Sequence, residues 1–196
     1  MTKTVLAAAL MVFAVQANAE TFKVDTAKST IAWKATKKVM GGHNGKVSIK
    51  EGRVDVDAKK NEVTGLKVVA DMKTITAEDL AADAGTQKKF LGHVSSADFF
   101  DVAKYPTAEF KLDKIAKKGN ETVASGQLTF IGQTKPVEFP VTFKIDKGVA
   151  TGSGKLQVDR TKWGLKYGSG NFFKELAADK IINDNFELDI NIVASK

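Results

Sequence analysis

Residues 137–145 read Val-Glu-Phe-Pro-Val-Thr-Phe-Lys-Ile, and the alternation in this run decides the fold class. Every second side chain is apolar, while Glu138, Thr142 and Lys144 between them are polar. Residues 186–192, Phe-Glu-Leu-Asp-Ile-Asn-Ile, repeat the pattern. Because successive side chains of a β-strand point to opposite faces, this period of two predicts strands that bury one face.

The same alternation predicts eight strands, several of them joined by short turns such as Lys118-Gly119-Asn120. Strands joined by short turns are antiparallel neighbours. A sheet with one apolar face can enclose that face by closing, and eight strands close around an interior that side chains fill or that holds one small ligand. We therefore predict an all-β fold, an eight-stranded antiparallel barrel of the lipocalin-like type, with a two-sheet sandwich as the alternative. The predicted strands lie near residues 22–37, 46–57, 63–73, 106–117, 121–132, 136–147, 149–160 and 184–194.

Two connectors interrupt the alternation and predict one or two short helices. The first runs from Thr76 to Leu91, with Thr76 as the N-cap and Asp79 three residues later as part of a capping box. Residues 171–178 predict a second, shorter helical piece.

Prolines and glycines predict local departures from regular strands. Pro136 and Pro140 lack a backbone N–H, so they fit a strand start or a sheet edge. Gly152-Ser153-Gly154 lies within a predicted strand, where a bulge or a barrel bend is the expected reason for such glycines.

The first nineteen residues predict a signal peptide. Lys3 provides a positive start, residues 5–15 are apolar, and Ala17-Asn18-Ala19 is a cleavage motif. We expect cleavage after Ala19, so that residues 20–196 form one exported domain, periplasmic in a Gram-negative source. The chain has no cysteine, so we expect neither disulfides nor a lipid-anchored cysteine, and no stable membrane anchor.

The basic balance does not predict nucleic-acid binding. The net charge is +7, but Arg53 and Arg160 are the only arginines, and the lysines are scattered along strands and turns. Recognition of bases and phosphates uses the planar guanidinium group of arginine. A solvated surface, with weak attraction to anionic membranes, is the better interpretation.

No set of catalytic or metal-binding residues is evident in the sequence. His43 and His93 are the two histidines, and their separation matches no metal-binding motif. We therefore predict no enzyme activity, no metal and no cofactor.

Aromatic side chains fall mainly where the alternation turns them inward, and two Phe-Phe pairs lie in connectors that would cover the ends of the barrel. An apolar interior with aromatic lids suits a long hydrocarbon chain. The predicted residues of this interior and its lids are Trp33, Phe99, Phe100, Phe110, Phe130, Phe139, Phe143, Trp163, Phe172 and Phe173.

Three ordered blocks of sequence resemble one known family. They are residues 91–110, LGHVSSADFFDVAKYPTAEF, residues 126–136, GQLTFIGQTKP, and residues 158–165, VDRTKWGL. Together they resemble the YceI-like lipid/polyisoprenoid-binding family of bacterial secreted proteins. The resemblance implies a lipocalin-like barrel that carries an isoprenoid or another long-chain lipid, with polar residues for its head group near the mouth.

The polar candidates for head-group contact are matched from that resemblance, with Arg160 preferred. An arginine beside Trp163 could hold a phosphate or a quinone oxygen; a salt bridge to Asp159 or to a loop carboxylate is the alternative. Residues 25–29 carry Lys28 where many relatives have histidine, so head-group specificity is not transferred. The four candidates are Arg160, His93, Ser29 and Tyr167.

The first functional interpretation is a periplasmic carrier of an isoprenoid quinone or a polyprenyl lipid. The second is a filled barrel whose outer face binds a protein. The third is a lipid-modifying enzyme with His93 and Asp98 as acid and base. We expect an exposed strand edge, and with it a homodimer, only if the barrel closes incompletely.

Overall fold

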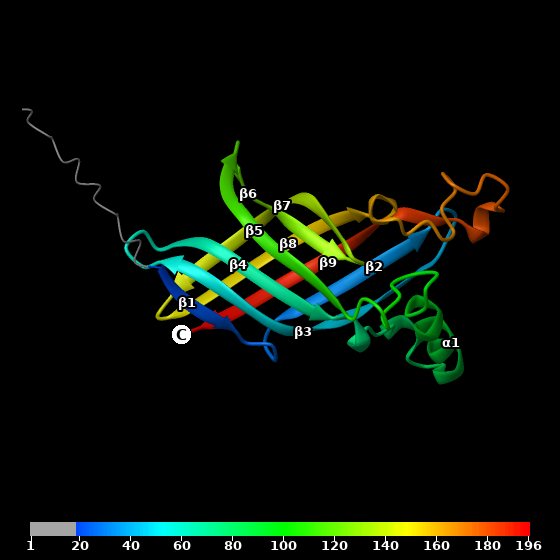
Figure 1. Ribbon diagram of the computed structural model, residues 1–196, viewed down its shortest axis with the longest axis horizontal. Helices are drawn as coiled ribbons and strands as arrows, with labels where there is room; N and C mark the ends of the chain where they lie inside the picture. The colour runs from blue at the N-terminus through cyan, green and yellow to red at the C-terminus, as the bar shows by residue number, and fades with distance from the viewer. Residues whose placement is uncertain (1–18) are drawn as a thin grey trace, which may run out of the picture.

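In the computed structural model, which describes residues 19–196, the chain forms a nine-stranded antiparallel sheet closed into a barrel (Figure 1). Helix α1 (Ala84–Val94) and the connector between β8 and β9 lie at one end, called here the α1 end. The turns β3–β4 and β7–β8 and the C-terminus lie at the far end. The strands are β1 (Ala19–Val24), β2 (Thr30–Lys37), β3 (Gly42–Asp57), β4 (Glu62–Asp71), β5 (Thr107–Lys118), β6 (Glu121–Phe130), β7 (Gln133–Asp146), β8 (Val149–Asp159) and β9 (Ile182–Ser195).

The pairing of β3 with β4 closes the sheet. Ser48 to Asp57 of β3 pair with Glu62 to Asp71 of β4, while the other edge of β3 pairs with β1 and β2. From β2 the order runs through β9, β8, β7, β6, β5 and β4 back to β3. The predicted barrel is therefore confirmed, and the alternative of a two-sheet sandwich is wrong.

The predicted first strand, residues 22–37, is in fact two strands at one position of the barrel. Both β1 and β2 lie between β3 and β9, so the sheet of nine strands still has eight positions around the barrel. The break is a turn in which the carboxylate of Asp25 accepts hydrogen bonds from the N–H groups of Ala27 and Lys28, each at 3.1 Å. A short acidic side chain that bonds to its own backbone ends the strand here.

The side chain of Ser29 continues the hydrogen bonding to β9 at this break. Its hydroxyl accepts from the N–H of Val193 in β9 at 2.9 Å and lies 3.2 Å from the carbonyl of the same residue. The hydroxyl thus takes the place of a backbone hydrogen-bonding group of a neighbouring strand. Ser29 is buried, and its position explains why the wall remains continuous across the turn.

Strand β7 changes neighbours halfway along. Its first half, through Pro140, pairs with β6, and its second half, from Val141, pairs with β8. Pro136 and Pro140 therefore lie where the edge toward β8 is unpaired, which confirms the predicted edge position. Of the two reasons predicted for Gly152–Gly154, the bulge is wrong, because these residues pair in regular register with both β7 and β9, while the barrel bend stays a prediction.

The helical predictions need correction. Thr76 is not an N-cap; its hydroxyl accepts from the N–H of Lys46 in β3 at 2.9 Å, so it serves the sheet instead. Helix α1 begins after Asp83, whose carboxylate accepts from the N–H of Thr86. The predicted helical piece at residues 171–178 is wrong: residues 171–177 form no helix, and a single 3-10 turn follows at Ala178–Lys180.

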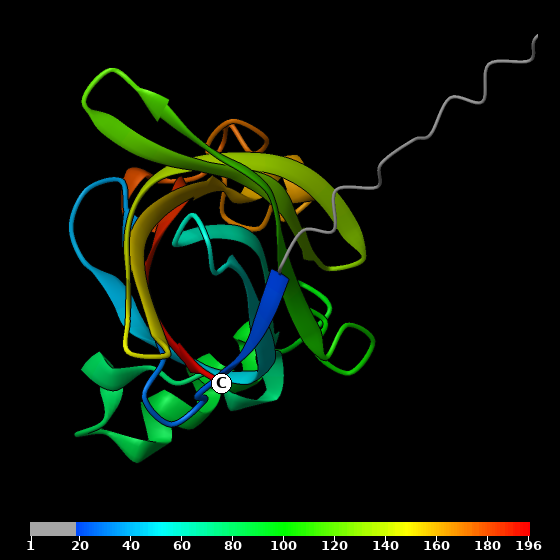
Figure 2. The same cartoon turned by 90° about the vertical axis from the view of Figure 1, so that its left-hand side faces the viewer.

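Two apolar clusters fill different parts of the barrel. The far end is closed by side chains that are at most 2% exposed, Phe22, Val24, Val56 and Ala194. Toward the α1 end, Phe130, Trp163 and Leu165 belong to the second cluster. The view along the barrel shows the β5–β6 hairpin leaving the wall (Figure 2).

The predicted signal peptide lies outside the described residues, except for Ala19, which pairs with Asp57 at the start of β1. Within residues 19–196 no helix has the length and apolar character needed to cross a bilayer.

We expect Ser29→Ala to lower the free energy of unfolding by about 1–3 kcal/mol, because it leaves the half-buried N–H of Val193 without its acceptor. Ser153→Ala is the control, since it removes a hydroxyl from an exposed pair with Thr142. Urea unfolding of both variants measures the difference. An equal loss in the two proteins would contradict the structural role of Ser29.

Candidate functional site

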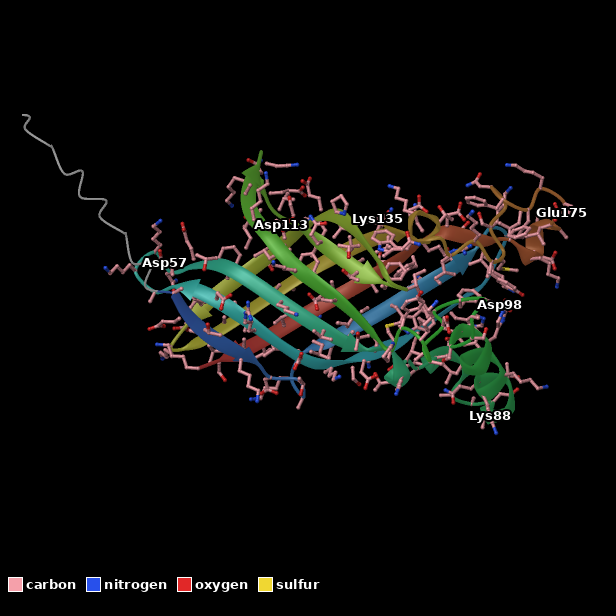
Figure 3. All side chains as sticks on the ribbon, viewed as in Figure 1. Asp57, Lys88, Asp98, Asp113, Lys135 and Glu175 are labelled. Atoms are coloured by element: carbon pink, nitrogen blue, oxygen red, sulfur yellow. The ribbon has the colours of Figure 1, made fainter. Side chains whose placement is uncertain are left out.

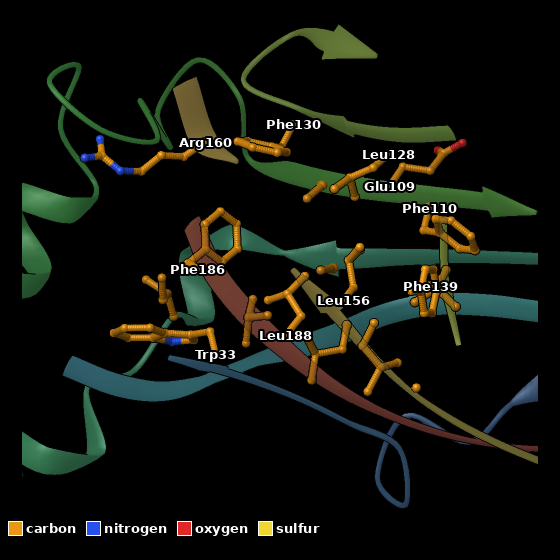
Figure 4. Close-up of a pocket in the computed structure, with 18 of the residues that line it drawn as sticks. Trp33, Glu109, Phe110, Leu128, Phe130, Phe139, Leu156, Arg160, Phe186 and Leu188 are labelled. Carbon is orange, nitrogen blue, oxygen red and sulfur yellow. The ribbon is translucent and has the colours of Figure 1, made fainter. Parts of the chain in front are cut away.

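The interior of the barrel contains a cavity of about 420 Å³. This volume lies within the range of small-molecule sites. Apolar side chains of eight strands, β2 to β9, form most of its wall, among them Leu128, Leu156 and Leu188 (Figure 4). Toward the far end the cavity is lined by Val54, Ala150 and Ile192, which belong to the apolar cluster there. Such a cavity can hold a hydrocarbon chain without leaving buried polar groups unpaired.

Seven of the ten predicted aromatic residues line this cavity. Phe110 and Phe139 meet edge to face, with their ring centroids 5.5 Å apart, and Phe100 meets Phe130 at 6.2 Å. Contact with a ligand remains a prediction for all of them. The lining aromatics are Trp33, Phe99, Phe100, Phe110, Phe130, Phe139 and Phe143.

The other three predicted aromatic residues lie elsewhere. Trp163 is 2% exposed and stacks behind Phe130 at 4.8 Å, with its indole N–H donating to the carbonyl of Leu128. It supports the wall and does not face the cavity. Phe172 and Phe173 lie in the connector before β9, exposed by 48% and 40%. They do not line the cavity, and contact with a ligand stays a prediction for them.

Two glycines make room for the central aromatic pair. A methyl group on Gly126 would lie 2.7 Å from the ring of Phe110, and one on Gly154 would lie 2.9 Å from the ring of Phe139. Each glycine therefore lets one ring approach the backbone of the wall closely. The volume left in the cavity depends on these missing side chains.

At the α1 end the cavity opens between aromatic and polar groups. Phe90 of α1 stacks on Trp33 at 6.3 Å and tilts against His43 at 4.3 Å. On the other side, His93 meets Phe99 and Tyr167 edge to face. His43, His93 and Tyr167 all line the cavity, so this mouth carries both histidines and a tyrosine.

His43 is held by Asp79, a contact that the sequence did not predict. Nδ1 of His43 lies 2.8 Å from the carboxylate of Asp79, which also accepts from the N–H of Asn44. Burial raises the pKa of Asp79, but the two hydrogen bonds outweigh it, so the pKa lies below its usual value. The ionised carboxylate holds Nδ1 and fixes the ring, so Nε2 is the ring nitrogen that we expect to meet a ligand.

Arg160, the preferred head-group candidate, is occupied by the protein itself. Nε donates to the carbonyl of Asn183, Nη1 to those of Leu165 and Tyr167, and Nη2 to that of Ile182. Nη2 also lies 3.6 Å from the carboxylate of Asp184. Burial lowers the pKa of Arg160, and Asp184 opposes the shift. The observed carboxylate partner is therefore Asp184 of β9, neither Asp159 nor a loop residue, and Arg160 ties the connector after β8 to β9.

The remaining polar candidates are separated along the barrel. Ser29 lies in the β1–β2 turn with its hydroxyl on Val193 and does not line the cavity, whereas His93 and Tyr167 do. Nε2 of His93 is 3.7 Å from Asp98, longer than a hydrogen bond. Among residues 19–196 no cluster of three metal-ligating side chains occurs.

The cavity also meets the surface at the side. Phe143 lies on the inner face of β7 with Phe139, yet it is 38% exposed. From Val141 onward β7 pairs only with β8, and the β5–β6 hairpin has left the wall beside it. Thr142 and Ser153, which pair on the outer face, also border the cavity. The cavity thus has a mouth at the α1 end and a side opening.

The family described as the YceI-like domain matches residues 22–194. A Pseudomonas putida protein named UPF0312 protein is 33% identical over 131 residues, which cover 65% of this chain and 64% of that protein. The match therefore spans less than two thirds of that relative.

Two solved structures share the fold. The crystal structure of Burkholderia cenocepacia BcnA has a TM-score of 0.65 and 26% identity, covering 88% of this chain and 99% of that one. A polyisoprenoid binding domain from Saccharophagus degradans, implicated in plant cell wall breakdown, has a TM-score of 0.61 and 13% identity, covering 89% and 97%. The second likeness, at this identity, is one of fold alone.

Gly154→Ala should push the ring of Phe139 into the cavity and lower the free energy of unfolding by about 1–3 kcal/mol through overpacking. Gly152→Ala is a matched control on the same face of β8, because its new methyl group would lie 3.6 Å from the carbonyl oxygen of Thr142, an ordinary contact distance. Thermal unfolding compares the two variants. Equal melting temperatures of the two variants would show that the position of the Phe139 ring does not depend on Gly154.

Arg160→Lys should lower the free energy of unfolding by about 3 kcal/mol, because lysine cannot reach the same set of carbonyls. Arg53→Lys, at an exposed arginine, should change it by less than about 1 kcal/mol. Urea unfolding provides both values. An unchanged free energy of unfolding in Arg160→Lys would contradict this structural role and would favour contact between Arg160 and a head group.

Proposed function

This chain belongs to the YceI-like domain family, and we propose that it is a binding protein that holds the apolar chain of an isoprenoid quinone or a polyprenyl lipid inside its barrel. The observation that carries the proposal is the cavity itself. Apolar strand faces form most of its wall, and His43, His93 and Tyr167 lie at the mouth. A long amphiphile has the same division between chain and head group.

The size of the apolar wall favours a hydrocarbon ligand. Burying roughly 400 Å² of chain surface is worth on the order of 10 kcal/mol before the costs of ordering and association. Phe110, Phe139 and Leu188 offer dispersion contacts and no hydrogen bonds, so they do not discriminate among chains of similar width. Selectivity for a head group then depends on the mouth.

We place the head group at the α1 end. His43 has one ring nitrogen fixed on Asp79, and its other nitrogen can accept from a hydroxyl or, when protonated, donate to an oxygen. His93 and Tyr167 lie on the opposite side of the mouth. Arg160 contributes by positioning the connector that carries Tyr167.

A carrier fits these observations better than the alternatives. A filled barrel would have no interior space, whereas this barrel encloses a cavity. An acid–base enzyme would need His93 in hydrogen-bond reach of its partner, and its ring instead packs against Phe99 and Tyr167. The Saccharophagus degradans protein of the same fold is a polyisoprenoid binding domain, which supports this ligand class for the chain. The signal-peptide pattern supports action in the periplasm.

The proposal predicts that the protein, purified from its native compartment without detergent, carries a stoichiometric long-chain lipid in an organic extract analysed by mass spectrometry. Ala108→Phe should remove this lipid, because Ala108 lines the cavity and the larger ring fills it.

Ala116→Phe on the same strand is the control. Ala116 lies on the outer face of the β5–β6 hairpin, paired with Val123, so its lipid content should match that of the wild type. A lipid retained equally by both variants would show that it is bound outside the barrel. A wild-type extract without any lipid, and no uptake of farnesol by the wild type, would overturn the carrier proposal.

A further inference from the structure

Exposed apolar side chains gather around one opening of the cavity. Among residues 19–196, seven large apolar side chains are exposed, and five of them lie at the α1 end. The other two are Phe143 and Val149. We call the five the mouth rim: Val39 (63% exposed), Met40 (83%), Tyr167 (44%), Phe172 (48%) and Phe173 (40%). Single exposed apolar residues are ordinary, but a group of five around an opening marks an interaction site.

The two segments that carry the rim lie side by side. The N–H of Lys38 donates to the carbonyl of Ile181 at 2.9 Å, and Lys37 pairs with Ile182 at the end of β2. Val39 and Met40 form the apex of the β2–β3 turn, which Gly41, with a φ of +92°, helps to reverse. Figure 3 shows side chains projecting outward at the end where Asp98 and Glu175 are labelled. The rim is thus one continuous surface made from two adjacent loops.

The rim is flanked by positive charge. Residues 37–42 and 166–180 contain five lysines against Glu175 and Asp179. Nζ of Lys166 lies 4.7 Å from the centre of the Phe172 ring, so one ammonium group stands directly beside an exposed aromatic side chain. Exposed apolar side chains among lysines are the combination that binds at the surface of an anionic bilayer.

The rim is also continuous with the cavity. Lys37 and Tyr167 belong to the rim segments and line the cavity as well. A chain that leaves a bilayer beside the rim would enter the barrel without crossing water. The side opening lacks this arrangement, because Phe143 is the one large apolar side chain exposed there within the described residues.

We propose that the mouth rim docks reversibly on an anionic lipid bilayer, and that the lipid chain enters and leaves the barrel there. The uptake step rests on the proposed function. The docking step rests on the exposed side chains and lysines alone. The rim consists of two projecting loops and not a flat apolar face, which favours the headgroup region of a bilayer over a protein partner.

The test is co-sedimentation of the mature protein with vesicles of phosphatidylcholine and phosphatidylglycerol. Met40→Asp and Phe172→Asp should each lower the partition coefficient by about tenfold, because a carboxylate replaces an inserting apolar group. Val149→Asp is the matched control: it adds the same charge at an exposed apolar residue of the far end and should change the coefficient by less than about twofold. Binding of farnesol in solution should be equal in all four proteins.

The outcomes separate the two claims. The docking proposal is overturned if the wild type does not bind vesicles, or if all three variants lose vesicle binding equally. If farnesol still binds in that case, the carrier function stands. Rim-dependent vesicle binding without farnesol binding supports the docking surface and overturns the carrier function. A loss of farnesol binding in Met40→Asp and Phe172→Asp alone would also overturn the proposal, because these residues would then act on the cavity and not on the membrane.

Discussion

The pairing of β3 with β4 is the interaction on which the rest of the structure depends. Alternation gives each strand one apolar face, and an open sheet would expose that face along the whole chain. Closure through β3 turns the faces inward, and strand β7, which changes neighbours at Pro140, lets the wall curve around a wide interior. The cavity is a consequence of this closure. The far end is plugged by Phe22 and its neighbours, and the α1 end is bordered by loops that side chains of the protein hold in place.

A few glycines and buried side chains preserve the space inside the barrel. Gly126 and Gly154 let the rings of Phe110 and Phe139 lie against the wall, and Trp163 supports Phe130 from behind. Arg160 uses its guanidinium to join the connector after β8 to β9, which keeps Tyr167 at the mouth. These residues contribute to binding through the position of other groups, and each of them is buried or nearly so.

Much of the fold could be predicted from the sequence, because a period of two is a local signal that every strand repeats. The break at residues 25–29 was missed because it depends on one side chain, that of Asp25, bonding to its own turn. The start of α1 was missed because the hydroxyl of Thr76 meets β3, thirty residues away in sequence. The site was harder to predict. Alternation placed Phe110, Phe139 and Trp33 in the interior, but nothing local indicated that Asp79 would hold His43 or that four carbonyls would occupy Arg160.

The central claim is that an apolar chain lies inside the barrel with its polar end at the α1 end. The most direct measurement is photo-crosslinking with a farnesol analogue that carries a diazirine at the tail, followed by peptide mapping by mass spectrometry. The account predicts adducts on inward-facing residues deep in the barrel, such as Leu156 and Leu188, which unlabelled farnesol suppresses. Adducts confined to Phe172, Phe173 or the outer faces of the strands would contradict it, because the chain would then bind on the surface.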